Sequence, residues 1–416
     1  MSSALCRRRD TCRLCGSRDL GLVLQLTPTP PANAFVPASA LSQAQETFPL
    51  DVFFCRSCGH VQLLDVVDPG VLFENYVYVS GTSPAFVAHF QRYAEDMISH
   101  LGLKPGDLVI DIGSNDGTLL RFFKKAGMRV LGIDPAKQIA ADATAAGIPT
   151  LPEFFTGDVA ARIVAEHGPA ALITANNMFA HADGLDFITD GIASLLRPGG
   201  AFVFEVSYLV DVYRNTLFDT IYHEHVAYHS VKPLIPFFRA HGLEMTDAIR
   251  VTSHGGSLRG IARKPDQATP AVNASVALAV SEEEALGLDR EETLKAFARQ
   301  IDGLKSDLVS LLRKLKSEGK SIAGFGAPAK ATTLMYHFGL GTDVIDFIVD
   351  DSPLKQNLYT PGLHVPVLPA SAIAERKPDY LVLLAWNFAK PIMEKNQAYR
   401  DAGGHFITPV PRVEVF

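Results

Sequence analysis

The sequence predicts an α/β protein in which a small cysteine-rich domain precedes two domains of βαβ type. Three observations support this prediction. Two Cys-x-x-Cys pairs lie near the N-terminus, and a glycine-rich turn follows an apolar, strand-like run at Gly113 and again at Gly324. At 416 residues the chain is long enough for two or three domains with sizeable cores. We expect the domains to cover residues 1–75, 76–280 and 281–416.

The paired cysteines are Cys12, Cys15, Cys55 and Cys58, and a glycine follows each pair. Two such pairs are the usual way to wrap a tetrahedral zinc ion, because backbone N–H groups in each turn stabilise the thiolates. Disulfides and a redox-active pair are the alternatives, and a reducing compartment disfavours the disulfides. The sequence therefore predicts a structural zinc site, since four thiolates leave no open position for chemistry. Cys6 has no partner in this scheme and is expected to be a free thiol.

The first glycine-rich turn lies inside a complete strand, turn, helix and strand pattern. Residues 108–112 are apolar and β-branched, as in a strand that is buried on both faces of a parallel sheet. Gly113 and Gly117 bracket the turn, an apolar helical face follows, and a second strand at residues 129–133 ends at Asp134. Glycines let the backbone approach a ligand, and a carboxylate after the second strand can accept both ribose hydroxyls. The pattern predicts a site for an adenosine-containing cofactor.

The spacing within this turn narrows the cofactor. Three residues separate the glycines and one of them, Asp116, is acidic, so the turn is not the dinucleotide fingerprint G-x-G-x-x-G. An anionic turn suits the uncharged ribose and cationic sulfonium of S-adenosylmethionine better than a pyrophosphate, and a βα turn without ligand is the alternative. A further strand at residues 171–174 should bring residues 176–181 to the same edge of the sheet. The residues predicted to bind the cofactor are Gly113, Ser114, Asn115, Asp116, Gly117, Asp134, Asn176 and Asn177.

The order of these elements is informative as a whole. Residues 194–200 are expected to form a helix end with Gly and Pro punctuation, and a strand-like run follows at residues 201–205. Each piece alone is a weak signal. Together they resemble the Rossmann-like core of class I methyltransferases.

A long predicted helix precedes the second glycine-rich turn. Between residues 282 and 318, apolar side chains recur at spacings of three and four, which predicts one face of an amphipathic helix. We expect this face to pack against its own protein, with a coiled coil as the alternative. Its apolar positions are Leu294, Phe297, Ile301, Leu304, Leu308, Leu311 and Leu315.

The second turn contains Gly324 and Gly326, and a strand at residues 344–351 ends in two aspartates about twenty residues later. Taken alone, this is a motif for NAD. However, Lys330 stands where the helix begins and offers a cation to phosphates, so the turn could equally hold the pyrophosphate of a nucleotide sugar. An NAD-dependent nucleotide-sugar oxidoreductase is therefore the alternative to a methyltransferase. A non-enzymatic zinc-ribbon scaffold is a third interpretation, which leaves the cofactor turn at Gly113 unexplained.

The densest cluster of ionisable side chains is Tyr222, His223, Glu224 and His225. If the segment is extended, its side chains alternate between two sides, whereas Tyr222 and His225 meet if it turns. The compact His-Glu-His order does not fit a helical H-E-x-x-H metal site. These are either satisfied structural groups or a general base beside a methyl donor. Carbon methylation would need such a base close to an acidified C–H, and a hydrogen-bond donor for the enolate oxygen.

Several motifs along the chain together point to one family. They lie at residues 12–15, 55–58, 73–78, 111–117, 176–181, 222–225, 253–258 and 324–330. Over nearly its whole length the chain resembles the three-domain sugar C-methyltransferases of bacterial deoxysugar biosynthesis, most of all those that methylate carbon 3′ in the tetronitrose pathway. The resemblance implies a zinc-binding N-terminal domain, a central S-adenosylmethionine domain and a C-terminal Rossmann-like domain that helps to hold a dTDP-sugar.

The resemblance also implies roles for individual residues. The implied catalytic residues are His225, Glu224, Tyr222, His181 and Tyr76. His225 would remove the proton at carbon 3 of a dTDP-linked 3-amino-4-ketosugar, although from the sequence alone His223 and His225 are near equals as the base. The residues expected to bind the substrate in the third domain are Lys330, Gly326 and Asp351.

Charge and composition exclude other classes of function. The net charge of -7 comes from 45 acidic against 38 basic residues without a long run of either sign, which argues against nucleic acid as a substrate. No run approaches about eighteen apolar residues, and the N-terminal residues lack an apolar stretch, so we expect a cytoplasmic protein without a membrane segment. Nothing in the sequence requires a partner chain, and we expect a monomer.

Overall fold

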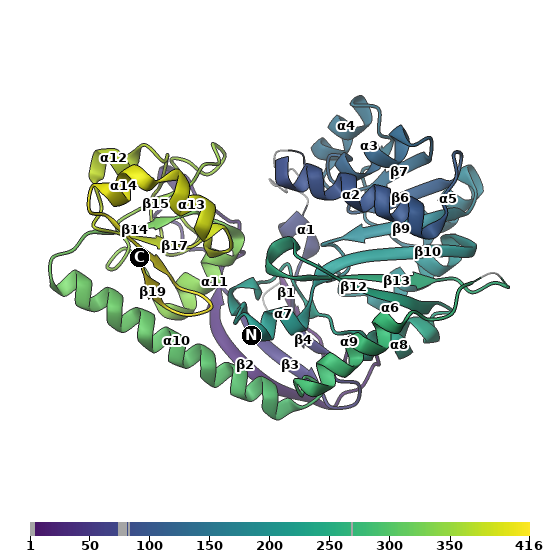
Figure 1. Ribbon diagram of the computed structural model, residues 1–416, viewed down its shortest axis with the longest axis horizontal. Coiled ribbons are helices and arrows are strands. Elements are labelled where there is room, and N and C mark those ends of the chain that lie inside the picture. Colours follow the sequence, from purple (N-terminus) through teal and green to yellow (C-terminus); the bar gives the residue numbers. More distant parts are fainter. Residues whose placement is uncertain (1–4, 74–80, 82–83, 268) are drawn as a thin grey trace.

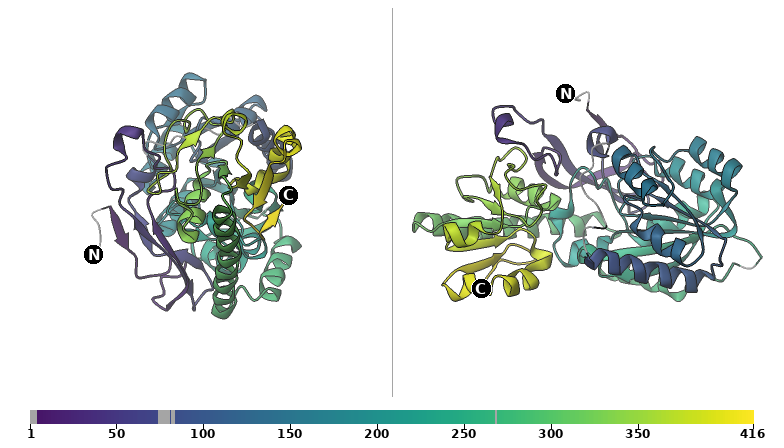
Figure 2. Two further views of the ribbon diagram at one scale, coloured as in Figure 1. Left: turned by 90° about the vertical axis from the view of Figure 1, so that its left-hand side faces the viewer. Right: turned by 90° about the horizontal axis from the view of Figure 1, so that it is seen from above.

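The computed structural model describes residues 5–73, 81, 84–267 and 269–416, which form two lobes joined by a third region (Figure 1). The right-hand lobe in Figure 1 holds a seven-stranded sheet and the left-hand lobe a six-stranded sheet. The N-terminal strands, drawn in purple, run from one lobe towards the other, as the right-hand view of Figure 2 shows. The predicted α/β class, with a small N-terminal domain and two Rossmann-like domains, is confirmed.

The N-terminal region forms two antiparallel sheets. Its elements are β1 (Cys6–Arg8), β2 (Leu20–Thr29), η1 (Ala38–Ala40), β3 (Phe48–Cys55), β4 (Val61–Leu63), β5 (Asp65–Val67) and α1 (Pro69–Phe73). The larger sheet has the order β11-β4-β3-β2, and its outer strand, β11 (Ala227–Tyr228), comes from the middle of the chain. Ala227 pairs with Gln62, so the segment directly after the Tyr222 to His225 cluster is hydrogen-bonded to the cysteine-rich domain.

The central region is a mostly parallel sheet with helices on both faces. Its elements are α2 (Pro84–Leu101), β6 (Leu108–Ile112), α3 (Thr118–Lys125), β7 (Arg129–Ile133), α4 (Lys137–Ala145), β8 (Thr150–Leu151), α5 (Gly157–His167), β9 (Ala170–Asn176), α6 (Leu185–Leu195), β10 (Leu196–Ser207), α7 (Leu209–Arg214), η3 (Phe218–Thr220), α8 (Val231–Ala240), β12 (Glu244–Val251), η4 (Ser253–Gly255) and β13 (Ser257–Arg263). The strand order is β12-β13-β10-β9-β6-β7-β8, and β13 runs antiparallel to both of its neighbours.

The strands predicted around the first glycine-rich turn are confirmed as β6 and β7. Every residue of β6 is buried, as its apolar composition requires for a central parallel strand. In the sheet, β7 and β8 lie on one side of β6, and β9 and β10 lie on the other. The strand order therefore reverses at β6, and the turn after β6 lies at this point. The helix end expected within residues 194–200 is confirmed, because α6 ends at Leu195. The strand expected at 201–205 begins earlier, since β10 starts at Leu196, with a register irregularity between Leu196 and Ala201.

The C-terminal region repeats this architecture on a smaller scale. Its elements are α9 (Ala274–Ala285), α10 (Glu291–Ser317), β14 (Ile322–Phe325), α11 (Ala329–Phe338), β15 (Ile348–Val349), β16 (Val367–Leu368), α12 (Ala372–Arg376), β17 (Tyr380–Leu383), η5 (Trp386–Phe388), α13 (Ala389–Lys395), α14 (Gln397–Asp401), β18 (His405–Thr408) and β19 (Glu414–Val415). The order is β16-β15-β14-β17-β18-β19, and only β19 pairs antiparallel among these described strands. The predicted strand at 344–351 shortens to β15.

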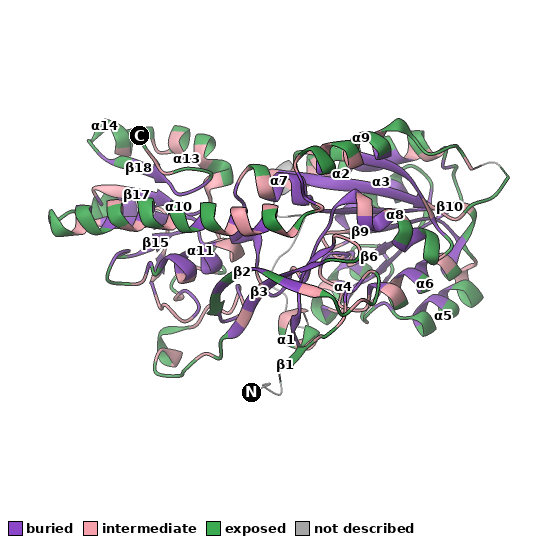
Figure 3. Cartoon of the chain, turned by 90° about the horizontal axis from the view of Figure 1, so that it is seen from below, coloured by how far each residue is buried: buried purple, intermediate pink, exposed green. Residues whose placement is uncertain are grey.

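The long amphipathic pattern corresponds to two helices, so its predicted start at residue 282 was wrong. Gly287 adopts a left-handed φ of 70° between α9 and α10, which interrupts the helix. The buried face of α10 consists of Leu294, Phe297, Ile301, Leu304, Leu308, Leu312 and Leu315, with Leu312 in the place expected for Leu311. This face packs on β2 of the same chain, while the opposite face is exposed in Figure 3.

One apolar core runs through all three regions. A single cluster of buried side chains contains Leu50 from the N-terminal sheet, Ile110 from β6 and Ile322 from β14. Two smaller clusters fill the outer sides of the central and C-terminal sheets. The three regions therefore share their largest core and hold one another in place.

Candidate active site and metal centre

The four paired cysteines converge on one point. Cys12 Sγ lies 3.7 Å from Cys58 Sγ, Cys15 Sγ lies 3.5 Å from Cys55 Sγ, and all four sulfur atoms are within 4.8 Å of one another. A tetrahedral zinc ion with Zn–S bonds of about 2.3 Å needs sulfur atoms about 3.8 Å apart. The donor set therefore fits structural zinc, as predicted, and Cys6 lies outside this cluster.

The glycines after the two cysteine pairs complete the metal-binding turns. Gly16 and Gly59 donate their N–H groups to the carbonyls of Cys12 and Cys55 at 3.0 and 2.8 Å. Both glycines have φ values in the left-handed region, at 69° and 84°. These tight turns point the sulfur atoms of each pair to the same side.

The turn after β6 is fixed by hydrogen bonds to the end of β7. Gly113 has a φ of 77° and donates its N–H to the Ile133 carbonyl at 2.7 Å. The N–H of Asn115 binds one oxygen of Asp134 at 2.8 Å, and the N–H of Ala136 binds the other at 2.9 Å. Each carboxylate oxygen keeps a lone pair for a ligand. Burial raises the pKa of Asp134, and these two amides act in the opposite direction.

The other predicted cofactor residues of this turn serve its shape as well. Asp116 accepts hydrogen bonds from the N–H and hydroxyl of Thr118, at 3.2 and 2.7 Å, at the start of α3. Ser114 is buried against Gly132, where a Cβ would lie 2.4 Å from the Ser114 hydroxyl oxygen. A Cβ on Gly117 would lie 2.9 Å from the side chain of Ile148. Close packing therefore requires both of these glycines.

Asn176 is the last residue of β9 and Asn177 follows it, at the same edge of the sheet as the turn after β6. Asn177 adopts a φ of 54° and donates its N–H to the carbonyl of Glu205 at 2.8 Å. Under them, Asp111 accepts the hydroxyl of Thr174 at 2.6 Å. Burial raises the pKa of Asp111 to about 7, Thr174 lowers it, and the charge of Asp134 raises it.

A buried ion pair beneath this edge was missed by the sequence analysis. Glu205 of β10 accepts hydrogen bonds from Arg259 of β13 at 2.6 Å and contacts His89 of α2 at 2.9 Å. The Arg259 guanidinium lies 4.2 Å from the ring centre of Tyr93. Contacts to His89 and Arg259 hold the pKa of Glu205 below its usual range despite burial. No sequence signal could have found this network, because its members lie on three elements, α2, β10 and β13, that are far apart along the chain.

The Tyr222 to His225 segment forms a turn, which settles the alternative that the sequence left open. The His225 N–H binds the Tyr222 carbonyl at 2.8 Å, and the two rings lie 4.1 Å apart. The His181 ring lies 4.9 Å from that of His225, and Phe73 stacks on His181 at 5.7 Å. Three of the predicted catalytic side chains therefore form one ring cluster. Tyr76 lies outside the described residues.

A backbone carbonyl fixes the tautomer of His225. Its Nδ1 lies 2.8 Å from the carbonyl oxygen of Thr220, at the end of η3. A carbonyl can only accept a hydrogen bond, so Nδ1 carries the proton and neutral His225 has its lone pair on Nε2. This is the form that a general base needs.

The two other members of the segment contact the N-terminal region. His223 is 1% exposed, and its Nε2 lies 3.1 Å from the Phe48 carbonyl in the N-terminal sheet. Burial lowers the pKa of His223 to about 4. Glu224 is buried and accepts a hydrogen bond from the Asn33 amide at 2.9 Å. Like the Glu205 network, Asn33 was not identified by the sequence analysis.

The turn after β14 repeats the backbone arrangement of the first turn. Gly326 donates its N–H to the Val349 carbonyl at 2.7 Å. Asp350 accepts the N–H of Ala327 at 2.6 Å and the N–H of Ser352 at 2.8 Å. A Cβ on Gly326 would lie 2.5 Å from the Cβ of Ala385, so packing alone requires this glycine.

The predicted substrate-binding cation and carboxylate lie in different surroundings. The Lys330 ammonium is 3.6 Å from the ring centre of Trp386 and donates to Asn387 at 2.6 Å. Burial lowers the pKa of Lys330 to about 8. Asp351 has 59% of its side chain exposed and forms an ion pair with Lys395 at 2.7 Å.

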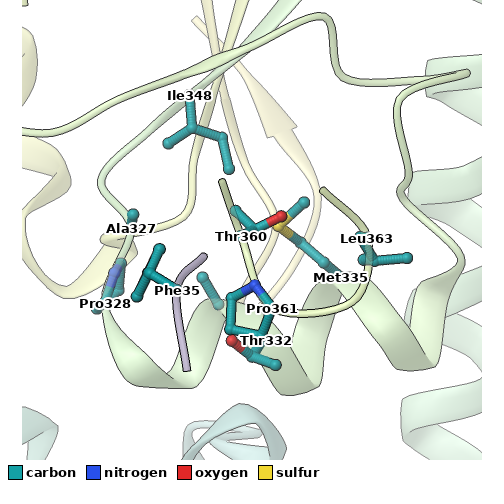
Figure 4. A pocket seen from close by; sticks show the side chains of 10 residues that line it. Phe35, Ala327, Pro328, Thr332, Met335, Ile348, Thr360, Pro361 and Leu363 are labelled. Atoms are coloured by element: carbon teal, nitrogen blue, oxygen red, sulfur yellow. The ribbon is translucent and has the colours of Figure 1, made fainter. Parts of the chain in front are cut away.

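A small apolar pocket lies beside the second turn (Figure 4). Phe35 reaches it from the N-terminal region and faces Pro328 at the start of α11, while Thr360 and Pro361 close another side. Lys355 lies next to this pocket, with its ammonium 5.3 Å from the Phe35 ring centre and 2.7 Å from the Ala327 carbonyl.

None of the helices in the described part of the chain has the length and apolar composition of a membrane span.

Three family models match the chain in succession. They are described as "Putative zinc binding domain" for residues 12–73, "Methyltransferase domain" for residues 86–248 and "C-methyltransferase C-terminal domain" for residues 252–411. The first covers all four clustered cysteines. The second covers the turn after β6 and the two strands beside β6, which are β7 and β9.

Individual relatives agree with these models. The C-methyltransferase NovU of Streptomyces niveus is 36% identical over 406 residues, which cover 98% of this chain and 96% of that protein. A ubiquinone biosynthesis O-methyltransferase of Burkholderia thailandensis is 28% identical over 177 residues, 38% of this chain and 72% of that protein. A solved magnesium protoporphyrin IX methyltransferase of Synechocystis with bound S-adenosylmethionine covers 43% of this chain and 81% of its own, at 16% identity and a TM-score of 0.33. The full-length similarity to NovU and the three successive domains show that this chain belongs to the family of S-adenosylmethionine-dependent C-methyltransferases.

Proposed function

We propose that the protein methylates carbon 3 of a dTDP-linked 4-keto deoxysugar, with an amino group at carbon 3, through an enolate that His225 generates. The observation that carries this proposal is the hydrogen bond between His225 Nδ1 and the Thr220 carbonyl, because it places the proton on Nδ1 and the lone pair on Nε2, the tautomer that a general base needs. His223 is the weaker candidate, since it is buried against Phe48. These surroundings support His225 over His223 as the base.

The chemistry follows from the keto group at carbon 4, which acidifies the neighbouring C–H. His225 Nε2 takes the proton of carbon 3, the electron pair of that C–H bond forms a C3–C4 double bond, and the carbonyl oxygen takes the negative charge. The Tyr222 ring lies against His225, so we assign its hydroxyl as the hydrogen-bond donor to this oxygen. When bound, S-adenosylmethionine would supply the methyl group: the C–C bond at carbon 3 would form as the methyl–sulfur bond breaks, and the sulfur would leave with that electron pair as S-adenosylhomocysteine.

The turn after β6 is the proposed site of the methyl donor. Asp134 presents two carboxylate oxygens at the carboxyl end of β7, and each accepts one hydrogen bond from a backbone N–H group. These oxygens suit the two ribose hydroxyls. Asp116 adds negative charge to the turn, which favours a cationic sulfonium. The remaining predicted cofactor residues line the same edge of the sheet and stay part of this proposal.

The turn after β14 is the proposed site of the dTDP group. Lys330 lies beside it as a half-buried cation, and the backbone at Gly326 lies at the point where the strand order of this sheet reverses. Asp351 would contact the substrate only if its ion pair with Lys395 opened. Glu224, His181 and Tyr76 complete the proposed sugar pocket, as the family resemblance implies.

The test is turnover of dTDP-4-ketosugars with S-adenosylmethionine, followed as a mass gain of one methylene. His225→Asn is expected to lower kcat by about 100-fold or more, because it removes the base, and to leave the affinity for S-adenosylhomocysteine unchanged. His241→Asn is the matched control, since His241 directly follows α8, contacts Asp190 and lies outside the ring cluster. Unchanged turnover of His225→Asn would move the base to His223, Glu224 or a water molecule.

An NAD-dependent oxidation, the alternative that the second turn left open, is not favoured by the family of the chain. Calorimetric titration with S-adenosylhomocysteine and, separately, with NAD distinguishes the two reactions. We expect tight binding of S-adenosylhomocysteine only. Binding of NAD alone would move the active site to the turn after β14.

A further inference from the structure

The C-terminal domain contacts the short helix that precedes the proposed base. Trp386 of η5 donates its indole N–H to Oδ2 of Asp219 at 2.6 Å. Asp219 belongs to η3 and stands next to Thr220, whose carbonyl accepts the hydrogen bond from His225 Nδ1 at 2.8 Å. One hydrogen bond and one peptide unit therefore separate a side chain of the third domain from the group that sets the tautomer of His225.

A second contact supports the other side of the same turn. Thr333 of α11 donates its hydroxyl to the carbonyl of Ile221 at 2.7 Å. Both Thr333 and Ile221 are buried, so this hydrogen bond does not compete with water. Asp219 and Ile221 flank Thr220, and the C-terminal domain thus holds Thr220 from both sides.

The surroundings of Asp219 show that the tryptophan contact is needed. Its carboxyl group is 0% exposed, and Oδ1 has no hydrogen-bond partner among the described residues. A buried carboxylate is costly unless it accepts hydrogen bonds, so the indole N–H is a principal support of this group. The Lys330 ammonium lies over the same indole ring at 3.6 Å and adds a nearby positive charge.

We propose that Trp386 is a positioning residue for His225, because its hydrogen bond to Asp219 holds the η3 turn in the conformation in which Thr220 binds Nδ1. This inference rests on the proposed role of His225 as the base. It adds a function for the C-terminal domain beyond holding the nucleotide: this domain also orders the residue that takes the proton. Trp386 itself touches neither the reacting carbon nor the proton.

The experiment uses the full-length zinc-loaded protein and two assays. The first measures kcat and KM for methylation of the dTDP-4-ketosugar. The second measures exchange of the carbon 3 proton with deuterium oxide in the presence of S-adenosylhomocysteine, which occupies the donor site but transfers no methyl group. The second assay reports on proton removal without methyl transfer. Both rates are expressed per binding site for S-adenosylhomocysteine, counted by calorimetric titration, so that a smaller folded fraction does not lower them.

Trp386→Phe removes the indole N–H and keeps a ring under Lys330. We expect kcat and the exchange rate to fall by the same factor, about tenfold, with both KM values within about twofold of wild type. Asp219→Asn keeps an oxygen that can accept from the indole and should lose less. Tyr399→Phe is the matched control, because it removes a donor from an aromatic ring of the same domain, whose partner is the His405 carbonyl at 3.2 Å, and it should match wild type.

The outcomes separate this inference from the proposed function. If Trp386→Phe exchanges and turns over like Tyr399→Phe, or changes only KM, the positioning role is wrong. If His225→Asn keeps wild-type exchange and turnover, the proposed base itself is wrong. Thr333→Val removes the second contact and should show the same pattern as Trp386→Phe on a smaller scale, which keeps the test valid if Trp386→Phe does not fold.

Discussion

After β6 and after β14, a glycine donates its N–H to the last residue of the neighbouring strand at the same distance of 2.7 Å. In both places an aspartate follows that strand and accepts one N–H from the glycine-rich turn and one from two residues further on. The aspartates are Asp134 and Asp350. The backbone of the two turns is therefore built in the same way.

The side chains around the two turns differ in charge. The second-last residue of β6 is the buried Asp111, whereas the second-last residue of β14 is Gly324. The first turn contains Asp116, and the helix after the second turn begins near Lys330. The two turns thus share a backbone and differ in the charge around it, and this difference is the basis for proposing a different ligand at each turn.

Loss of zinc is the change with the largest expected effect, and it should disable both turns together. The N-terminal domain reaches the central lobe through β11 and the C-terminal lobe through Phe35. A structural zinc site contributes on the order of 10 kcal/mol to folding of its domain. Cys12→Ala should therefore lower the melting temperature and weaken binding of both S-adenosylhomocysteine and dTDP.

Cys6→Ala is the control for this measurement, because Cys6 lies outside the cluster. It should bind zinc and both ligands like wild type. If Cys12→Ala impaired only one ligand, the N-terminal domain would support a single lobe.

Gly113 and Gly326 are the glycines that donate their N–H groups to the neighbouring strand in the two turns. Replacing each with alanine should lower the free energy of unfolding by a different amount. Both positions have positive φ, which costs about 1 to 2 kcal/mol for alanine. At Gly326 the new Cβ would also meet the Ala385 Cβ at 2.5 Å, whereas at Gly113 it meets the flexible Met178 side chain at 3.1 Å. Chemical denaturation should show Gly326→Ala to be the less stable variant, by about 2 kcal/mol.

The exposed helical glycine Gly303 provides the control for alanine substitution, because a Cβ there meets no atom within 4 Å. Gly303→Ala should stabilise the protein by about 0.5 to 1 kcal/mol. Equal losses at Gly113 and Gly326 would show that backbone strain, and not packing, dominates both turns.

Replacing one charged side chain at each turn with a neutral one should weaken only the ligand proposed to bind at that turn. Asp134→Asn removes a charged acceptor and places an amide N–H group against a backbone N–H, so it should weaken S-adenosylhomocysteine by about 10- to 100-fold. Its affinity for dTDP should not change. Lys330→Met should show the reverse in the same calorimetric titrations, and loss of both ligands in either variant would contradict separate sites.

The smallest expected effect is a pH dependence that only the first turn has. Burial raises the pKa of Asp111 to about 7, above an unfolded value of about 3.9. Protonated Asp111 therefore stabilises the folded protein, and this stabilisation is complete below pH about 4. It is lost as the pH rises from there through about 7. Asp111→Asn should flatten this dependence by about 1 to 2 kcal/mol, as measured by chemical denaturation below pH about 4 and above pH about 7.

Local patterns in the sequence predicted the frame of this molecule well. The apolar run at residues 108–112 is typical of a buried strand, and four cysteines in two Cys-x-x-Cys pairs favour a metal site over disulfides. The glycine-rich turns indicated the two sheet edges at which we propose that ligands bind. Each of these features depends on neighbours within a few residues, which is why sequence alone was sufficient.

Contacts between distant segments could not be predicted in this way. Asn33 binds Glu224 across 191 residues, and Trp386 binds Asp219 across 167. The choice between His223 and His225 also depended on tertiary structure, since it required the positions of the Phe48 and Thr220 carbonyls. Such contacts leave no periodic pattern in the chain, and only the folded structure reveals them.

The two-residue strand β11 also has a consequence for recombining enzymes of this family. Chimeras are usually cut between domains, but here residues 227–228 of the central region are the outer strand of the N-terminal sheet. A cut near residue 80 would pair one parent's β4 with the other parent's β11, only two residues after His225. Successful chimeras should therefore transfer the segment from η3 to β11 together with the N-terminal domain.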